Sequence, residues 1–204
     1  MKTAAIIVNY NTPEIISRAV NSIKNHVDEV VIVDHSDIDN HAYDECRLLA
    51  KKNPNIKDIK THKNIGHGPG MNIGIANTIA DIIIVMDSDA ELRQPEVIEE
   101  MKQAISNQNV YGCGLVVNVN QHGATDPNGQ YKYLHPYFAM VKRSVFLQHP
   151  EFINHGAPWL LTMKTIHGKL DVVNIPGIQK KAWHEHRRTR QIASPSWRKN
   201  WQIV

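Results

Sequence analysis

Short apolar runs alternate with amphipathic segments through the first half of the chain. The predicted strands are Ala4–Val8, Val30–Val33, Ile56–Lys60 and Ile82–Met86. The segment that begins at Pro13, with Thr12 at its N-cap, has apolar residues at helical spacing, and a second helix is expected over residues 41–52. This alternation predicts an α/β fold, with a mostly parallel central sheet flanked by helices.

The second half of the chain has longer strand signals and fewer helical ones. Helical segments are expected near Pro95–Ser106 and Trp159–His167, and strands over Val110–Val119, Tyr131–Arg143 and Leu170–Ile175. No repeat or linker interrupts the 204 residues, and this length favours one domain. We expect a single domain over residues 1–204, made of a half of about 1–92, a half of about 93–180 and a tail of about 181–204.

Polar residues follow three of the predicted strands at the point where each strand ends. They are Asn9-Tyr10-Asn11, Asp34-His35-Ser36 and Asp87-Ser88-Asp89. Ligands of open α/β sheets collect at the carboxyl ends of the strands, so these groups should line one crevice. The carboxylates of Asp87 and Asp89 are suited to hold a divalent cation between the protein and a phosphate-bearing substrate. The alternative is a solvated acidic turn after a core strand.

A glycine-rich stretch, Asn64–Ile75, lies between the third and fourth predicted strands. Glycines at alternate positions allow a positive φ and a close approach of the backbone to a ligand, and the segment that follows, to Thr78, can enter a helix. The spacing lacks the third glycine of a dinucleotide-binding fingerprint and does not follow the first strand. The alternative is a purely structural turn.

Composition restricts the compartment and the kind of site. Cys46 and Cys113 are far apart, which excludes a disulfide framework or a cysteine zinc site and favours a reducing cytoplasm. The apolar N-terminal run is broken by Asn9, too early for a secretory signal or a membrane span. We therefore expect a cytoplasmic protein with no transmembrane segment.

Charge is unevenly distributed along the chain. Residues 180–204 carry a formal charge of +6, and the first 179 residues carry −3. Trp183, Trp197 and Trp201 lie among the basic residues of this tail, a mixture that can contact nucleic acid or an anionic membrane surface. The alternative is a solvated segment whose tryptophans pack on the domain.

Four stretches, taken together and in this order, resemble family-2 glycosyltransferases with the GT-A fold. They are Ile6-Ile7-Val8-Asn9-Tyr10-Asn11, Val31-Ile32-Val33-Asp34-His35-Ser36, the glycine-rich stretch Asn64–Ile75, and Asp87-Ser88-Asp89. The glycine-rich stretch is most similar to the rhamnosyltransferase-like branch. The resemblance covers roughly residues 4–92 well and the remainder loosely.

The resemblance implies a nucleotide-sugar donor and a divalent cation, Mn²⁺ or Mg²⁺, that stabilises the leaving diphosphate. It assigns donor binding to Asn9, Tyr10, Asp34, Ser36, Gly66, Asn72, Asp87 and Ser88. It places the metal on Asp89, with Asp87 facing the ribose or sugar. A late histidine near the metal would be His184 or His186, and spacing does not choose between them, because both share one face of a strand.

The acceptor side departs from the family pattern. An inverting transferase needs a base for the acceptor hydroxyl, and the acidic pair that usually supplies it is missing from the corresponding segment, residues 155–161. His155 and Asp126 are the candidates that remain. UDP is the nucleotide that the family suggests, with GDP and dTDP open, and the acceptor is a nucleic acid, a lipid-linked glycan or a protein.

Two other functions remain open beside a metal-dependent glycosyltransferase. The missing acidic base favours a catalytically silent protein that binds a sugar nucleotide or another partner. A nucleotidyltransferase on a related fold would carry a basic glycine-rich loop directly after the first strand, where this chain has Asn9–Pro13.

Overall fold

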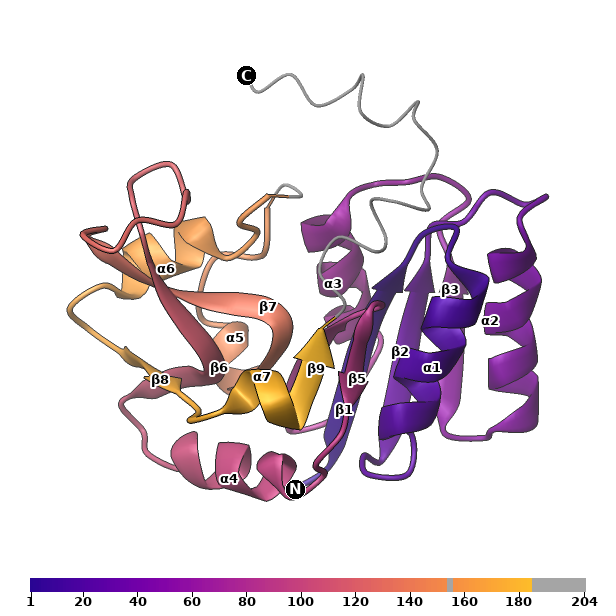
Figure 1. Ribbon diagram of the computed structural model, residues 1–204, viewed down its shortest axis with the longest axis horizontal. Coiled ribbons are helices and arrows are strands. Elements are labelled where there is room, and N and C mark those ends of the chain that lie inside the picture. Colours follow the sequence, from indigo (N-terminus) through magenta and orange to yellow (C-terminus); the bar gives the residue numbers. More distant parts are fainter. Residues whose placement is uncertain (154–155, 185–204) are drawn as a thin grey trace.

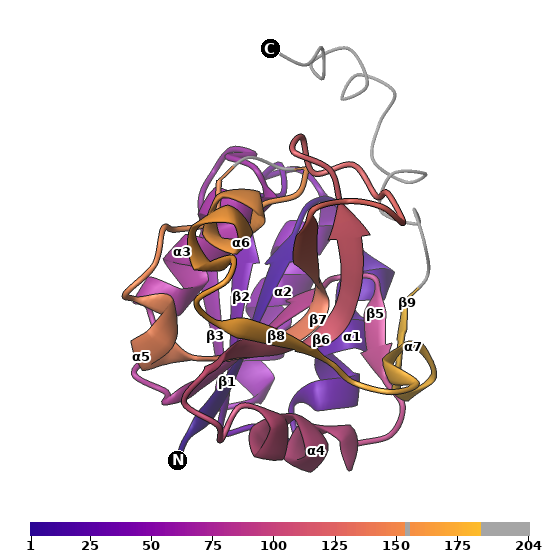
Figure 2. The ribbon, with the colours of Figure 1, turned by 90° about the vertical axis from the view of Figure 1, so that its left-hand side faces the viewer.

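The computed structural model describes residues 1–153 and 156–184, and its centre is a seven-stranded sheet with the order β3-β2-β1-β4-β7-β6-β8 (Figure 1). The strands of this sheet are β1 (Thr3–Asn9), β2 (Glu29–Asp34), β3 (Ile56–Lys60), β4 (Ile82–Asp87), β6 (Val110–Val119), β7 (Tyr131–Lys142) and β8 (Asp171–Asn174). Strand β8 lies at one edge of the sheet (Figure 2). Strands β5 (Ala90–Leu92) and β9 (Ala182–His184) pair separately as a small second sheet.

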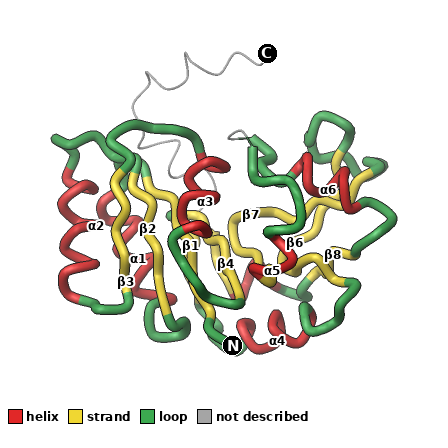
Figure 3. Tube along the Cα trace, turned by 180° about the vertical axis from the view of Figure 1, so that it is seen from behind, coloured by secondary structure: helices red, strands yellow, loops and turns green. Residues whose placement is uncertain are grey.

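Helices cover both faces of the large sheet (Figures 1 and 3). They are α1 (Pro13–Ile23), α2 (His41–Lys52), α3 (His67–Ala76), α4 (Val97–Ala104), α5 (Arg143–Phe146), α6 (Leu160–Ile166) and α7 (Ile178–Lys181). One core packs α1, α2, α4 and α7 against the sheet, and the other packs α3, α5 and α6 against the opposite face. Successive strand residues contribute to opposite cores, as Ile7 and Ile6 do, because side chains alternate across a strand.

The first four strands in space, β3-β2-β1-β4, run parallel. Most of their apolar residues are buried, on both faces of the sheet, which explains the uninterrupted apolar runs of the sequence. The β1 register pairs Asn9 with Asp34 and Val8 with Asp87, so the polar strand ends meet at one edge of the sheet. Strand β7 then pairs antiparallel with β4. The predicted α/β fold with a largely parallel central sheet is confirmed.

The glycine-rich stretch is mostly helical, so the helix that was expected to follow it begins within it, at His67. Within it only Gly66 has a positive φ, of 95°, and α3 begins at the next residue. A Cβ on Gly70 would lie 2.8 Å from Cε1 of His35, and a Cβ on Gly74 would overlap Ile6. The glycines along this face therefore let α3 approach β1 and β2 closely, which larger side chains would prevent.

Several short elements were not predicted from the sequence: β5, β9, α5 and α7, each of three or four residues. Thr12 lies at the N-cap position of α1 as predicted, but its hydroxyl donates to Asn9 Oδ1 at 2.6 Å and does not cap the helix. Among the described residues, no helix has the length and apolar character needed to span a membrane.

Candidate metal and donor site

Three side chains converge beyond the end of β4: Asp87, Asp89 and His184. Each offers a ligand atom, and these atoms all lie within 4.8 Å of one another. Nε2 of His184 is 3.0 Å from Oδ1 of Asp89 and 3.5 Å from Oδ2 of Asp87. We refer to these three residues as the Asp-Asp-His group.

Two short strands create this convergence. Asp87 ends β4, Ser88 and Asp89 form the turn, and β5 begins at Ala90. Strand β9 pairs antiparallel with β5 and sets His184 opposite Ala90 (Figure 1). The structure thus brings the first of the two predicted histidines to the carboxylates, and His186 lies outside the described residues.

The electrostatics of the Asp-Asp-His group favour a bound cation. Burial lowers the pKa of His184, but its hydrogen bond to Asp89 and the negative charges of Asp87 and Asp89 outweigh burial, so the pKa is raised. Asp89 itself is only 8% exposed. Two partly buried carboxylates that draw positive charge onto a histidine fit a divalent cation, which would take the place of the proton.

Two further aromatic side chains contact this group and were missed by sequence reasoning. Nε2 of His67 is 3.3 Å from Oδ1 of Asp87, and burial lowers the pKa of His67 to about 4, although the charge of Asp89 acts to raise it. The ring of Tyr137 on β7 stacks on His184. His67 could have been found from its place directly after Gly66, at the start of a helix; Tyr137 could have been found from the period-two aromatic series of β7.

The donor-binding residues predicted after β1 and β2 form a buried hydrogen-bond network. Asp34 is fully buried, and its Oδ1 accepts hydrogen bonds from Asn9 Nδ2 at 3.0 Å and from Ser36 Oγ at 2.5 Å. Its Oδ2 accepts from Lys60 Nζ at 2.6 Å. The network fixes the ends of three neighbouring strands relative to one another. Tyr10 is half-buried, and burial and then the charge of Asp37 raise its pKa.

A second group, Asp34, Cys46 and Asp58, has similar spacing but does not fit a metal. Lys60 already supplies its positive charge, with Nζ 2.6 Å from Asp34 and 3.1 Å from Asp58. Burial lowers the pKa of Lys60, yet the two carboxylates raise it by more. Burial, together with the same carboxylates, raises the pKa of the Cys46 thiol and keeps it protonated. An ammonium group therefore replaces a metal ion here.

Two other predicted donor-binding residues, Ser88 and Asn72, lie in the first half of the chain. Ser88 is buried in the turn of the Asp-Asp-His group. Asn72 donates from Nδ2 to the carbonyl of Phe152 at 2.8 Å, and the amide of Phe152 donates to Asn72 Oδ1 at 3.1 Å. This pair of bonds ties α3 to the segment that follows α5. The role of Asn72 in donor binding stays a prediction.

Of the two candidate bases, only Asp126 lies among the described residues, and it is not a member of the Asp-Asp-His group. Oδ1 of Asp126 accepts a hydrogen bond from the Asn128 amide at 2.9 Å, within the turn between β6 and β7. His155 lies outside the described residues. The identity of the base therefore stays a prediction.

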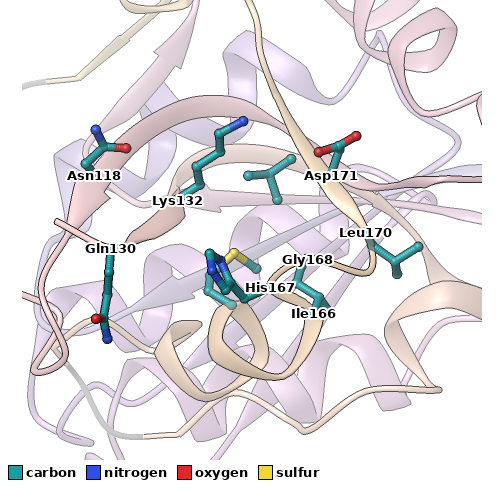
Figure 4. A pocket seen from close by; sticks show the side chains of 10 residues that line it. Asn118, Gln130, Lys132, Ile166, His167, Gly168, Leu170 and Asp171 are labelled. Atoms are coloured by element: carbon teal, nitrogen blue, oxygen red, sulfur yellow. The ribbon is translucent and has the colours of Figure 1, made fainter. Parts of the chain in front are cut away.

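A cavity of about 310 Å³ lies in the second half of the chain, among β6, β7, α6 and β8 (Figure 4). Met163 and Ile166 contribute apolar lining, and Lys132, His167 and Asp171 contribute exposed polar side chains. It shares no residue with the Asp-Asp-His group.

The basic tail is described only at its beginning. Trp183 belongs to β9, where the guanidinium carbon of Arg93 lies 4.4 Å from the centre of its ring. Trp183 therefore packs on the folded chain. Trp197 and Trp201 lie outside the described residues, so the expected contact of this tail with an anionic partner stays a prediction.

Comparison with known proteins extends these observations. The model of the family described as glycosyl transferase family 2 matches residues 4–166. An uncharacterized glycosyltransferase of Nostoc sp. (strain PCC 7120) is 31% identical over 115 residues, which are 55% of this chain and 35% of that protein.

Solved structures resemble the chain in fold at low identity. One is the mannosyltransferase PcManGT of Pyrobaculum calidifontis in complex with GDP-Man and Mn²⁺, with a TM-score of 0.70, 16% identity, and coverage of 87% of this chain and 55% of that one. Another is the 1–349 fragment of S. aureus TarS, with a TM-score of 0.61, 18% identity, and coverage of 87% and 58%. These likenesses show the expected GT-A fold.

The chain spans about a third of the length of the curated relative and somewhat more than half of these two solved chains. The family match covers most of the present chain, including β1–β4, the Asp87–Asp89 turn and β7. The chain therefore belongs to glycosyl transferase family 2.

Proposed function

We propose that the protein transfers a sugar from a nucleotide-sugar donor to an acceptor hydroxyl, with a divalent cation held by the Asp-Asp-His group. The observation that carries this proposal is the convergence of Asp87, Asp89 and His184 beyond the carboxyl end of β4. When bound, the cation supplies positive charge to the leaving diphosphate. The similar mannosyltransferase that was solved with GDP-Man and Mn²⁺ supports this type of chemistry.

The protein's own residues hold and orient the groups around that charge. Asp89 and Asp87 provide carboxylate oxygens, and His184 provides Nε2 from the opposite strand. His67 contacts the Asp87 oxygen that His184 does not, so the two imidazoles hold this carboxylate from both sides. Such preorganised charge, set before the substrate arrives, is a main source of catalytic stabilisation.

Mn²⁺ is the ion that we propose, in preference to Mg²⁺. Carboxylate oxygens suit both ions, but an imidazole nitrogen is a better ligand for a transition metal than for Mg²⁺. The direct contact between His184 and Asp89 supports this choice.

The donor nucleotide would lie along the edge formed by the ends of β1, β2 and β4. Asn9, Asp34 and Ser36 would support the base and ribose there through their buried network, with Tyr10 beside them. UDP is the first nucleotide to test, followed by GDP and dTDP. We propose an inverting transfer, with His155 or Asp126 as the base.

A second candidate function is donor binding without transfer. It is favoured by the absence of an acidic residue from residues 155–161, where the family usually carries its base. Hydrolysis of the donor separates the two functions without knowledge of the acceptor. An active transferase should release UDP slowly from a UDP-sugar with Mn²⁺, and Asp89→Asn should abolish this release. Tight binding of intact donor with no release, on any acceptor offered, would favour the silent protein.

The base is tested by the same assay with an acceptor mixture. Loss of transfer in His155→Ala or Asp126→Asn, with donor binding unchanged, would identify the base. Full activity in both variants would exclude both candidates.

A further inference from the structure

We infer that Tyr137 is a positioning residue for the cation site, because its ring fixes the plane of the His184 imidazole. The two ring centroids are 5.1 Å apart and the ring planes differ by 23°, which is a stacked arrangement. The inference rests on the proposed cation site and adds a residue that acts on that site through His184.

The strand register explains why Tyr137 reaches this place. Strands β4 and β7 pair antiparallel, with Met86 opposite Phe138. The pairing ends there, and the next residue on each strand is Asp87, the last residue of β4, and Tyr137 on β7. The tyrosine therefore approaches the Asp-Asp-His group from the large sheet, whereas His184 arrives from the small sheet through β9.

The ring of Tyr137, and not its hydroxyl, makes the contact with His184. Tyr137 is 1% exposed, and its hydroxyl is buried with no hydrogen-bond partner in the part of the chain that the structure describes. The ring of His135, two residues earlier on β7, lies 5.6 Å from the Tyr137 ring. Packing thus holds the Tyr137 ring in place, and the ring in turn limits rotation of the imidazole.

Orientation matters because a histidine binds a cation only along the direction of its nitrogen lone pair. Partners that orient a metal-binding histidine typically contribute 10–100-fold to metal affinity. His184 is the last residue of β9, a strand of three residues, and its side chain also contacts Asp89 and Asp87, the carboxylates that would share the cation. The stack with Tyr137 adds a restraint on the plane of the imidazole that does not come from the other proposed ligands.

The test is direct titration of the full chain with Mn²⁺ alone, with free Mn²⁺ followed by electron paramagnetic resonance. Tyr137→Leu removes the ring, Tyr137→Met replaces it with a flexible side chain of similar reach, and Tyr137→Phe removes only the hydroxyl. Tyr111→Leu is the matched control, because Tyr111 is equally buried but packs in the opposite core. Near-ultraviolet circular dichroism establishes that each variant is folded.

We expect Tyr137→Leu and Tyr137→Met to bind Mn²⁺ about 10–100-fold more weakly, and Tyr137→Phe and Tyr111→Leu to stay within about twofold of the wild type. In a His184→Ala background, Tyr137→Leu should not weaken Mn²⁺ binding further, because the effect passes through His184. A purely structural role would instead give the same loss of Mn²⁺ affinity in the wild type and in His184→Ala.

The outcomes separate this inference from the proposed function. Mn²⁺ binding by the wild type with no loss in Tyr137→Leu or Tyr137→Met would overturn the inference alone. An equal loss in Tyr137→Phe would assign the effect to the hydroxyl and overturn it as well. No Mn²⁺ binding by the wild type would remove the cation site, and the inference with it.

Discussion

Nε2 of His184 lies 3.0 Å from Oδ1 of Asp89, although 95 residues separate them in the sequence. The contact depends on β9 returning to pair with β5, directly after the Asp87–Asp89 turn. The two carboxylates and the imidazole are thereby brought together at the end of β4, where we propose that the cation binds.

Mn²⁺ affinity should depend on pH through His184. Its pKa is raised, mainly by Asp89 and Asp87 acting against burial, and a protonated imidazole cannot bind a metal. Affinity should therefore increase as the pH rises through this pKa and level off above it. Below the pKa, a plot of log affinity against pH should have a slope near one, because one proton is released for each ion bound. Calorimetric titration at several pH values measures this dependence. The slope should flatten in His184→Asn, and an unchanged slope in that variant would exclude His184 as the ligand.

Acid should destabilise the fold through His35. Burial lowers its pKa to about 4 from 6.5, with smaller effects of its neighbours. Below pH 6.5 His35 binds a proton in the unfolded chain but not in the folded chain. The free energy of unfolding therefore decreases as the pH is lowered from 6.5 to about 4, by about 3 kcal/mol. Urea unfolding across this range measures the loss. His35→Gln should show a shallower dependence, and an identical pH dependence in both proteins would contradict the assignment.

Gly74→Ala should destabilise the protein although alanine favours helices. A Cβ at this position would overlap the buried side chain of Ile6, and overpacking typically costs about 1–3 kcal/mol. Thermal and urea unfolding measure the change. Gly156→Ala is the control, because a Cβ there meets nothing within 4 Å. A Gly74→Ala variant as stable as the wild type would mean that α3 can move away from β1 at little cost.

Lys60→Met should be among the most destabilising substitutions at the ends of β2 and β3. It leaves Asp34, which is fully buried, and Asp58 without their ammonium partner, a change that typically costs about 3–5 kcal/mol. Lys57→Met on the same strand is the control. Lys57 pairs with Glu29, and the side chain of Lys57 is 55% exposed, so the free energy of unfolding should decrease by less than about 1 kcal/mol. Similar unfolding midpoints for the two variants would refute the role of Lys60.

The parallel half of the fold could be predicted because its local signals agree. Strand β4 is an apolar run buried on both faces and bounded by Asp87, and β1 and β2 end in the same way at Asn9 and Asp34. Parallel pairing then places all three ends at one edge, which follows from chain direction alone. Asp87 and Asp89 could therefore be proposed as a cation site before the structure was known.

The remainder of the site depends on tertiary contacts that leave little local signal. The choice of His184 depends on β5 and β9, which are three residues each and too short for a periodic pattern. His67 is one of 12 histidines, and its contact with Asp87 requires α3 to pack on the sheet. The positions Gly66, Gly70 and Gly74 are spaced for one face of a helix, and this spacing was the available sign that the stretch is helical.

The most direct test of the cation-dependent donor site is calorimetric titration of the full chain with UDP, GDP and dTDP. Each nucleotide is added with and without Mn²⁺, to the wild type and to Asp89→Asn. The account predicts that at least one nucleotide binds the wild type only with Mn²⁺, and that Asp89→Asn loses this binding. Absence of nucleotide binding in the wild type, or binding that neither Mn²⁺ nor Asp89 influences, would contradict it.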